Sequence, residues 1–279
     1  MCPHFTVTAM HAVSKNLYQI LRQLQDIPAL TKSSLVGGTN LAIRYGHRVS
    51  HDIDIFFPGI IGKPGFAEID RQVKSLQDLK IIASEYPLNL DDLRVWFRCF
   101  ILSKGETIKV DFIQNMNLLD PPETINGIRL ATERDIALMK LMAASNRATR
   151  KDVYDLDYLT DKLRLSSLMT TLQEKIASTS LLQQSVFELD SRFNPVDNPE
   201  LLLRFELPQD SSGHLWHGNQ ILLPLDGHKN WNAARASWRG KVRAYFRELG
   251  RPFPTLEEVA VACEPRRPDE PDMSMGYSW

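Results

Sequence analysis

Two aspartates separated by one residue, Asp52 and Asp54, interrupt an otherwise apolar segment of the sequence. On a β-strand alternate side chains share a face, so both carboxylates would point one way while Ile53 and Ile55 pack on the other side. A strand rise of ~3.3 Å per residue lets such a pair reach two cations ~3.5–4 Å apart, as in two-metal phosphoryl-transfer sites. The pair therefore predicts a site for Mg²⁺ or Mn²⁺. The alternative is a solvated strand end, since Asp-x-Asp is a common tripeptide.

A third acid, Asp111, lies within a second apolar segment, TIKVDFI. Strand alternation places it on the same face as Lys109 and Ile113. It could bind the second cation or accept a proton from the acceptor hydroxyl, because three carboxylates tolerate one another only around cations. The alternative is an acid at a strand end that faces water.

The sequence Gly37-Gly38-Thr39 follows a short apolar strand and precedes a helical segment. Glycines there could let the backbone approach a phosphate, with the Thr39 hydroxyl and the N-terminal amides of the helix as donors. Thr39 is also a plausible N-cap. A simple glycine turn between strand and helix is compatible with this interpretation. Arg48 and Ser50 lie on the approach to the acids, where Arg48 could neutralise triphosphate charge or be a surface arginine.

The elements that must position these residues follow from hydrophobic periodicity and turn signals. A loop is expected over 60–65, after a strand that ends at Pro58-Gly59. Beyond Thr132, a plausible N-cap, the pattern is mainly helical. We expect helices at 10–25, from 39, and at 66–76, 133–145, 151–163, 166–176, 181–189 and 231–249. We expect strands at 35–36, 52–57, 81–83, 93–102, 107–113 and 125–130.

The first of these motifs resembles that of the AbiEii/AbiGii toxin family, a branch of the DNA-polymerase-β-like nucleotidyltransferases. The resemblance rests on Gly37-Gly38-Thr39, Leu41-Ala42, Arg48, Ser50 and Asp52-Ile53-Asp54. It continues in IKVDFI, where a third acid is expected, in MKLMAASNR, which contains Lys140, and in RKDVYDL, so it spans about 35–159.

The resemblance implies an α+β fold, with a nucleotidyltransferase-type mixed sheet and flanking helices in the N-terminal half and a mostly helical C-terminal half. Residues 1–130 would form the catalytic domain, and 131–195 a helical region that completes the nucleotide site. The resemblance does not extend to residues 196–279. Their basic helical segment predicts a C-terminal region that could bind the acceptor, and the Pro- and charge-rich composition from Pro265 predicts a loose tail.

The resemblance also implies residue roles. Lys140 would bind the nucleotide, although a lysine in an apolar helix can also snorkel or pair. Asp152 and Asp155 would supply the last motif's acid, although Asp155 could pair with Lys151 four residues earlier. The implied activity is Mg²⁺-dependent transfer of an NMP from an NTP onto a hydroxyl of RNA, with tRNA as a candidate. The protein would be the toxin of a toxin–antitoxin or abortive-infection system, with an antitoxin partner. Two alternatives stay open: transfer to a small molecule of the aminoglycoside type, and a non-catalytic nucleotide-binding scaffold.

The segment 231–251 contains four arginines that recur every fourth residue, together with several aromatic side chains. On a helix they form one basic ridge, which could bind acceptor RNA. The alternative is a solvated helix whose aromatics face the core. The arginines of this ridge are Arg235, Arg239, Arg243 and Arg247.

The bulk properties exclude several classes of protein. A net charge of −1 gives no global argument for nucleic-acid binding. Three scattered cysteines, no signal-peptide pattern and no membrane-spanning apolar run predict a cytoplasmic protein without a membrane partner. His47 and His51 have HxxxH spacing, but they straddle a helix–strand junction and lack a third ligand, so we interpret them as surface or supporting residues.

Overall fold

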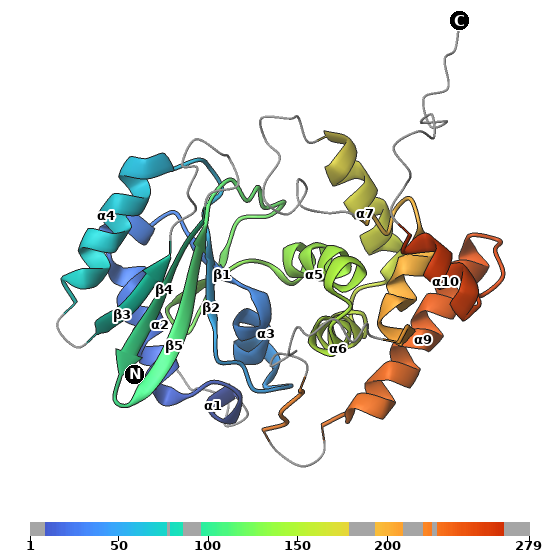
Figure 1. Ribbon diagram of the computed structural model, residues 1–279, viewed down its shortest axis with the longest axis horizontal. Coiled ribbons are helices and arrows are strands. Elements are labelled where there is room, and N and C mark those ends of the chain that lie inside the picture. Colours follow the sequence, from blue (N-terminus) through green and yellow to red (C-terminus); the bar gives the residue numbers. More distant parts are fainter. Residues whose placement is uncertain are drawn as a thin grey trace, which may run out of the picture.

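A mixed β-sheet forms the N-terminal half of the protein (Figure 1). The computed structural model describes residues 9–76, 79–85, 96–178, 193–208, 220–224 and 228–264. Within these residues seven strands lie in the order β3-β4-β5-β2-β1-β7-β6. The strands are β1 (Ser34–Val36), β2 (Ile53–Phe56), β3 (Lys80–Glu85), β4 (Trp96–Ser103), β5 (Glu106–Ile113), β6 (Glu123–Ile125) and β7 (Ile128–Leu130).

Helices flank the sheet and make up the described part of the C-terminal half. In Figure 1, α2 and α4 lie beside β3–β5 at one end of the molecule, α9 and α10 lie at the other, and α5 and α6 lie between them. The α-helices are α1 (Ala9–Ala12), α2 (Lys15–Asp26), α3 (Gly37–Tyr45), α4 (Gly62–Lys74), α5 (Glu133–Arg147), α6 (Arg150–Leu159), α7 (Leu165–Ser178), α9 (Trp231–Glu248) and α10 (Leu256–Ala262). The described residues also include the 3₁₀ segments η1 (Pro28–Leu30) and η3 (Pro199–Glu206).

The sheet is amphipathic in the region that concerns function. Ile53 and Ile55 of β2 are fully buried in a core shared with α2 and α4, as are Val110 and Phe112 of β5. The intervening residues of both strands face the opposite side, towards α5 and α6. The alternation expected for Ile53, Asp54 and Ile55 is therefore confirmed.

A second hydrophobic cluster forms between the C-terminal helices. It joins the apolar faces of α5, α6, α7, η3, α9 and α10, with the fully buried Trp238 among its largest side chains. The Trp238 indole donates a hydrogen bond to the Leu202 carbonyl at 2.9 Å, which fixes α9 against η3. The mainly helical character expected beyond Thr132 is confirmed, and the domain boundaries at 130 and 195 stay a prediction.

Some element boundaries differ from those expected. Helix α3 begins at Gly37, so Thr39 lies within the helix rather than capping it. The expected loop over 60–65 contains the start of α4, because Pro64 lies in its first turn, where a missing N–H costs no helical hydrogen bond. Asp52 precedes β2 instead of starting it.

Further expectations can be compared only in part. Helix α6 ends at Leu159, earlier than the expected 163. The expected helix at 181–189, the start of the strand at 93–102 and the tail from Pro265 lie outside the described residues. Across the described ranges, no helix combines the length and the apolar character needed to cross a membrane.

Candidate active site

Three aspartates gather where β2 and β5 run side by side, and we call them the acidic cluster. The two strands are parallel, and Asp54 lies directly opposite Asp111 in their register. Asp54 is half-buried and Asp111 is 6% exposed. Asp52 lies one residue before β2 with its side chain 54% exposed, so strand alternation does not set its direction. The sheet thus brings Asp54 and Asp111 together, with Asp52 at the solvent edge.

Two cations already contact this cluster. Arg98 on β4 lies opposite Asp111 and donates to both its oxygens, with Nε–Oδ1 2.6 Å and Nη2–Oδ2 3.0 Å. Lys109 Nζ lies 3.4 Å from Asp111 Oδ2 and 3.6 Å from Asp52 Oδ2. A positively charged group therefore occupies the space between two of the three carboxylates.

The acidic cluster keeps unbalanced negative charge at Asp54. Burial raises the pKa of Asp54 to about 6, and Asp111 and Asp52 add to the rise, while Lys109 and Lys140 oppose it. A carboxylate whose charge is this poorly compensated is stabilised by a nearby cation. The donor chemistry of the cluster therefore fits a hard divalent cation such as Mg²⁺.

The predicted three-aspartate metal site is not assembled in this conformation. Among the residues that the structure describes, no three His, Cys, Asp or Glu side chains are grouped to hold a metal ion. Asp52 and Asp54 would hold Mg²⁺, and Asp111 would have to exchange its bond with Arg98 to join them. The metal assignment of Asp52, Asp54 and Asp111 stays a prediction.

Gly37 and Gly38 allow two functional side chains to approach the start of α3. A Cβ atom added at Gly37 would collide with Oδ2 of Asp54, and one at Gly38 would collide with the guanidinium of Arg48. Gly37 also has φ +71°, a conformation that favours glycine. The observed role of these glycines is thus to admit protein side chains, and their predicted phosphate contact stays a prediction.

Thr39 and Ser50 position the segment that carries Asp52. The fully buried Thr39 hydroxyl lies 2.8 Å from Ser50 Oγ and donates to the main-chain carbonyl of Asp52. The main-chain N–H of Ser50 donates to the Ala12 carbonyl at 2.9 Å. These contacts hold the entry to β2, and contact of Thr39 or Ser50 with a nucleotide stays a prediction.

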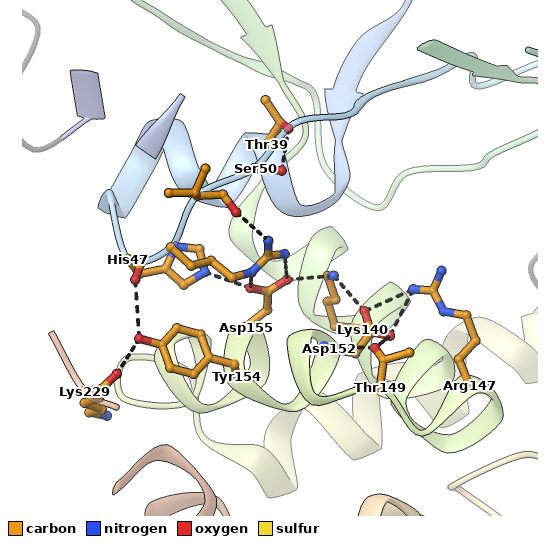
Figure 2. A network of polar contacts seen from close by, with 12 residues as sticks. Thr39, His47, Ser50, Lys140, Arg147, Thr149, Asp152, Tyr154, Asp155 and Lys229 are labelled. Atoms are coloured by element: carbon orange, nitrogen blue, oxygen red, sulfur yellow. Dashed lines mark hydrogen bonds and ion pairs between the residues drawn. The ribbon is translucent and has the colours of Figure 1, made fainter. Parts of the chain in front are cut away.

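A second group of charges lies on α5 and α6 (Figure 2). Lys140 of α5 bridges the two aspartates of α6, with Nζ 2.8 Å from Asp152 Oδ1 and 2.7 Å from Asp155 Oδ2. Asp152 also accepts from Arg147 and from the Thr149 hydroxyl, whose own oxygen caps α6. Lys140 is therefore paired as well as close to the acidic cluster.

Asp155 joins this group to the segment before β2. Arg48 donates to both its oxygens, with Nε–Oδ1 2.6 Å and Nη2–Oδ2 2.7 Å, and His47 Nε2 lies 2.7 Å from Oδ1. Although burial alone would raise the pKa of Asp155, Arg48 and Lys140 hold it well below its ordinary value. The third guanidinium nitrogen of Arg48, Nη1, donates a hydrogen bond to the Val49 carbonyl at 3.2 Å. Arg48 thus binds the protein itself, and its predicted contact with triphosphate stays a prediction.

Four cations in this region outnumber the two carboxylates, and we call them the basic cluster. Its members are Arg48, Lys140, Arg147 and Lys151. Burial lowers the pKa of Lys151, and the nearby Arg48 lowers it further. The basic cluster adjoins the acidic cluster, since Lys140 is near enough to lower the pKa of Asp54.

Sequence reasoning missed several of these contacts. The sequence predicts His47 as a surface or supporting residue, yet it is fully buried and contacts Asp155, so the surface interpretation is wrong. Burial lowers its pKa, and it stacks on Tyr154 with 5.8 Å between ring centroids. Strand alternation predicts Lys109 on the face of Asp111, and the structure confirms this contact. Arg98 is not predicted from the sequence, because only the pairing of β4 with β5 places it opposite Asp111.

The arginine ridge lies on α9, which packs against α6 (Figure 1). Arg235 forms an ion pair with Glu206, and Arg239 Nη1 lies 3.5 Å from the same carboxylate. Arg243 is exposed and its guanidinium lies 4.5 Å from the centre of the Phe253 ring. The fourth arginine, Arg247, is exposed. Two of the four therefore pair with an acid. RNA binding by the ridge stays a prediction.

The part of the chain that contains both clusters matches the sequence model of one protein family. The sequence model of a family described as nucleotidyl transferase AbiEii toxin, type IV TA system, matches residues 19–210. An uncharacterized protein of Aquifex aeolicus (strain VF5) is 32% identical over 193 residues, which are 66% of this chain and 86% of that protein. A solved structure, the nucleotidyltransferase toxin MenT4 from Mycobacterium tuberculosis H37Rv, shares 16% identity at a TM-score of 0.49, covering 94% of this chain and 91% of that one.

Proposed function

Because the chain belongs to the AbiEii family of nucleotidyltransferase toxins of type IV toxin–antitoxin systems, we propose that it transfers an NMP from an NTP onto a hydroxyl of RNA. Pyrophosphate is the second product. The reaction uses Mg²⁺ or Mn²⁺, and an antitoxin opposes its effect in the cell.

One observation carries this proposal: an under-neutralised acidic cluster lies beside a basic cluster with surplus positive charge. A triphosphate with its divalent cation has the complementary arrangement, since the cation suits the carboxylates and the phosphates suit the lysines. Because the two clusters are adjacent, they suit a substrate that brings a divalent cation and negatively charged phosphates together.

The proposed chemistry divides the work between the clusters. The oxygen of the acceptor hydroxyl attacks the α-phosphorus, the bond to the β-phosphate oxygen breaks, and pyrophosphate leaves. When bound, Mg²⁺ neutralises phosphate charge and favours ionisation of the hydroxyl. Asp52 and Asp54 orient the reacting groups, and a carboxylate of the acidic cluster takes up the hydroxyl proton. The basic cluster stabilises the charge that develops on the leaving group.

RNA is the acceptor that the family supports best, because a toxin must stop an essential process and RNA supplies abundant hydroxyl ends. The exposed Arg243 and Arg247 on α9 support this choice. A small-molecule acceptor of the aminoglycoside type is the competing proposal. The ion pairs of Arg235 and Arg239 with Glu206 favour it, because they leave less free charge for a polyanion.

The test is an incubation of the purified protein with each α-labelled NTP, Mg²⁺ and total cellular RNA. We expect the label of at least one nucleotide to appear in an RNA band and to disappear when EDTA is added. Parallel reactions with an aminoglycoside in place of RNA test the competing acceptor. Label in neither acceptor would contradict the proposed activity.

A further inference from the structure

Both cations expected to bind the nucleotide are already held by carboxylates. Arg48 is 4% exposed and gives two of its nitrogens to Asp155. Lys140 is 7% exposed and bridges Asp152 and Asp155. Either residue could turn to a phosphate only by leaving a buried carboxylate with fewer partners, which is costly. A cation that forms no ion pair with a buried carboxylate would be better suited to bind the substrate.

Lys151 is a cation of this kind. It is the second residue of α6 and precedes Asp155 by one helical turn, so the two side chains lie on the same face. The pair between Lys151 and Asp155 that the spacing allows is absent, because His47, Arg48 and Lys140 surround the carboxylate of Asp155. Across the described parts of the chain, Lys151 has no ion pair, although it is half-buried.

The charges around Lys151 explain what it would attract. Arg48 and Lys140 lie near enough to lower the pKa of Lys151, while Asp52 and Asp155 only partly offset burial and this repulsion. An anion placed beside these three cations would relieve their mutual repulsion. The attraction of Lys151 to Asp52, a member of the acidic cluster, indicates that the lysine lies towards that cluster.

We propose that Lys151 binds the β- and γ-phosphates of the NTP, the part of the substrate that leaves as pyrophosphate. This inference rests on the proposed function for its substrate class. A lysine ammonium is a compact charge on a flexible stem, which suits phosphate oxygens that shift as the bond breaks. Lys151 would thus stabilise the leaving group, while Arg48 and Lys140 hold α6 against the strand that carries the acids.

The test compares ligands that do and do not contain the proposed contact. Binding of a non-hydrolysable NTP analogue, inorganic pyrophosphate and the matching NMP is measured with Mg²⁺ for the wild type, Lys151→Met and Lys151→Arg. Loss of one charge-assisted contact should weaken analogue and pyrophosphate binding about tenfold in Lys151→Met. Binding of the NMP should not change, and Lys151→Arg should recover most of the lost affinity.

Lys162→Met is the matched control, since Lys162 is exposed just beyond α6 and pairs with Glu133 at 3.2 Å. It should bind all three ligands like the wild type. Folding lowers the pKa of Lys151, so the charged ammonium destabilises the folded state. Lys151→Met should therefore leave the melting temperature unchanged or raise it, and a binding defect in this variant would not reflect unfolding.

Three results would overturn the inference: unchanged pyrophosphate affinity in Lys151→Met, an equal loss of NMP affinity, or a wild type that binds neither pyrophosphate nor the analogue. The proposed function is tested by a separate measurement, the transfer of nucleotide by the wild type. If the wild type transfers no nucleotide but Lys151→Met still loses pyrophosphate affinity, the transferase proposal fails and the phosphate contact stands.

Discussion

Burial acts on both Asp54 and Asp155, yet the pKa values of the two carboxyls shift in opposite directions. Burial raises the pKa of Asp54 to about 6, because Lys109 and Lys140 do not offset the combined effect of burial, Asp111 and Asp52. At Asp155, Arg48 and Lys140 overcome burial and hold the pKa well below its ordinary value. One aspartate is therefore poised for an added cation, while the other is already neutralised by the protein. Perturbed carboxylates of the first kind mark functional sites more often than paired ones do.

Replacing Asp54 should separate activity from stability. Its pKa rises from 3.8 to about 6 on folding, so the stabilising contribution of the protonated carboxyl is full below pH 3.8 and is lost as pH rises through about 6. Asp54→Asn should therefore raise the free energy of unfolding at neutral pH, by at most roughly 3 kcal/mol, while abolishing transfer. Urea denaturation across this pH range measures the effect. Mg²⁺ should stabilise the wild type but not the variant, and a destabilised variant would show that Asp54 has a structural role instead.

Replacing Asp155 should have the opposite effect on stability. Asp155→Asn leaves Arg48 and Lys140 short of a buried counter-charge, which should cost about 3–5 kcal/mol at pH 7. Because folding lowers the pKa of Asp155, its contribution is present above 3.8 and is lost as pH falls towards the native value. The difference in unfolding free energy between wild type and variant should thus shrink near pH 3. As a control, Asp161→Asn removes a carboxylate that is 44% exposed and should cost below about 1 kcal/mol. Equal losses in both variants would argue against a buried role for Asp155.

At the scale of elements, the start of α3 links the two clusters. Gly37 faces Asp54 and Gly38 faces Arg48, so two consecutive residues set the positions of an acidic and a basic side chain. Helix α6 completes the arrangement, because its Asp155 fixes the same Arg48. A small change in the backbone of α3 would therefore be transmitted to both clusters.

Gly37→Ala should damage the site more than an ordinary glycine substitution. The new Cβ would collide with the Asp54 carboxylate, and the φ of +71° would strain an alanine. We expect a loss of about 1–3 kcal/mol in stability and loss of transfer activity. The control is Gly240→Ala in α9, where an added Cβ meets nothing within 4 Å and alanine should stabilise the helix by about 0.5–1 kcal/mol. Full transfer activity in Gly37→Ala would contradict the close contact with Asp54.

The sequence predicts the strands and their polar faces better than it predicts which side chains of different elements are in contact. Alternation in IDIF and TIKVDFI reveals which side of each strand is polar, because burial imposes a period of two residues. The pairing of Asp111 with Arg98 depends on the register between β4 and β5, and the approach of Asp54 to Asp111 depends on β5 also pairing with β2. His47 is similar, since HxxxH spacing carries no information about a partner on α6. The sequence does not single out Lys151, because a local pair with Asp155 is the simplest interpretation of its spacing.

At the scale of the molecule, the two clusters lie between a sheet-based core and a helical core. The first core packs α2 and α4 on the sheet, and the second joins α5–α7 with α9 and α10. Helix α9 connects to α6 through Lys241, whose Nζ lies 2.7 Å from Asp157 Oδ1 and 2.6 Å from Asp161 Oδ1. Much of the positive charge of α9 therefore holds the helices together. Of the four ridge arginines, the exposed Arg243 and Arg247 would therefore make the RNA contacts.

Arg243→Gln/Arg247→Gln should weaken RNA binding and reduce its dependence on salt. Each lost phosphate contact should lower the slope of log K against log salt by about 0.7 on a single strand. Filter binding across a salt series measures this, and NTP affinity should not change. The matched control is Arg235→Gln, which removes an ion pair with Glu206 and should affect stability more than RNA affinity. An unchanged salt slope in the folded double variant would exclude the ridge as the acceptor surface.

The most direct test of nucleotidyl transfer at the acidic cluster follows the α- and γ-phosphates of the NTP through the reaction. The protein is incubated with Mg²⁺, cellular RNA and the active NTP, labelled in one reaction at the α-phosphate and in another at the γ-phosphate. We predict that only the α-label enters RNA, that the γ-label is released as pyrophosphate, and that Asp54→Asn abolishes both outcomes. Entry of the γ-label into RNA, or full α-label transfer by Asp54→Asn, would contradict nucleotidyl transfer at the acidic cluster.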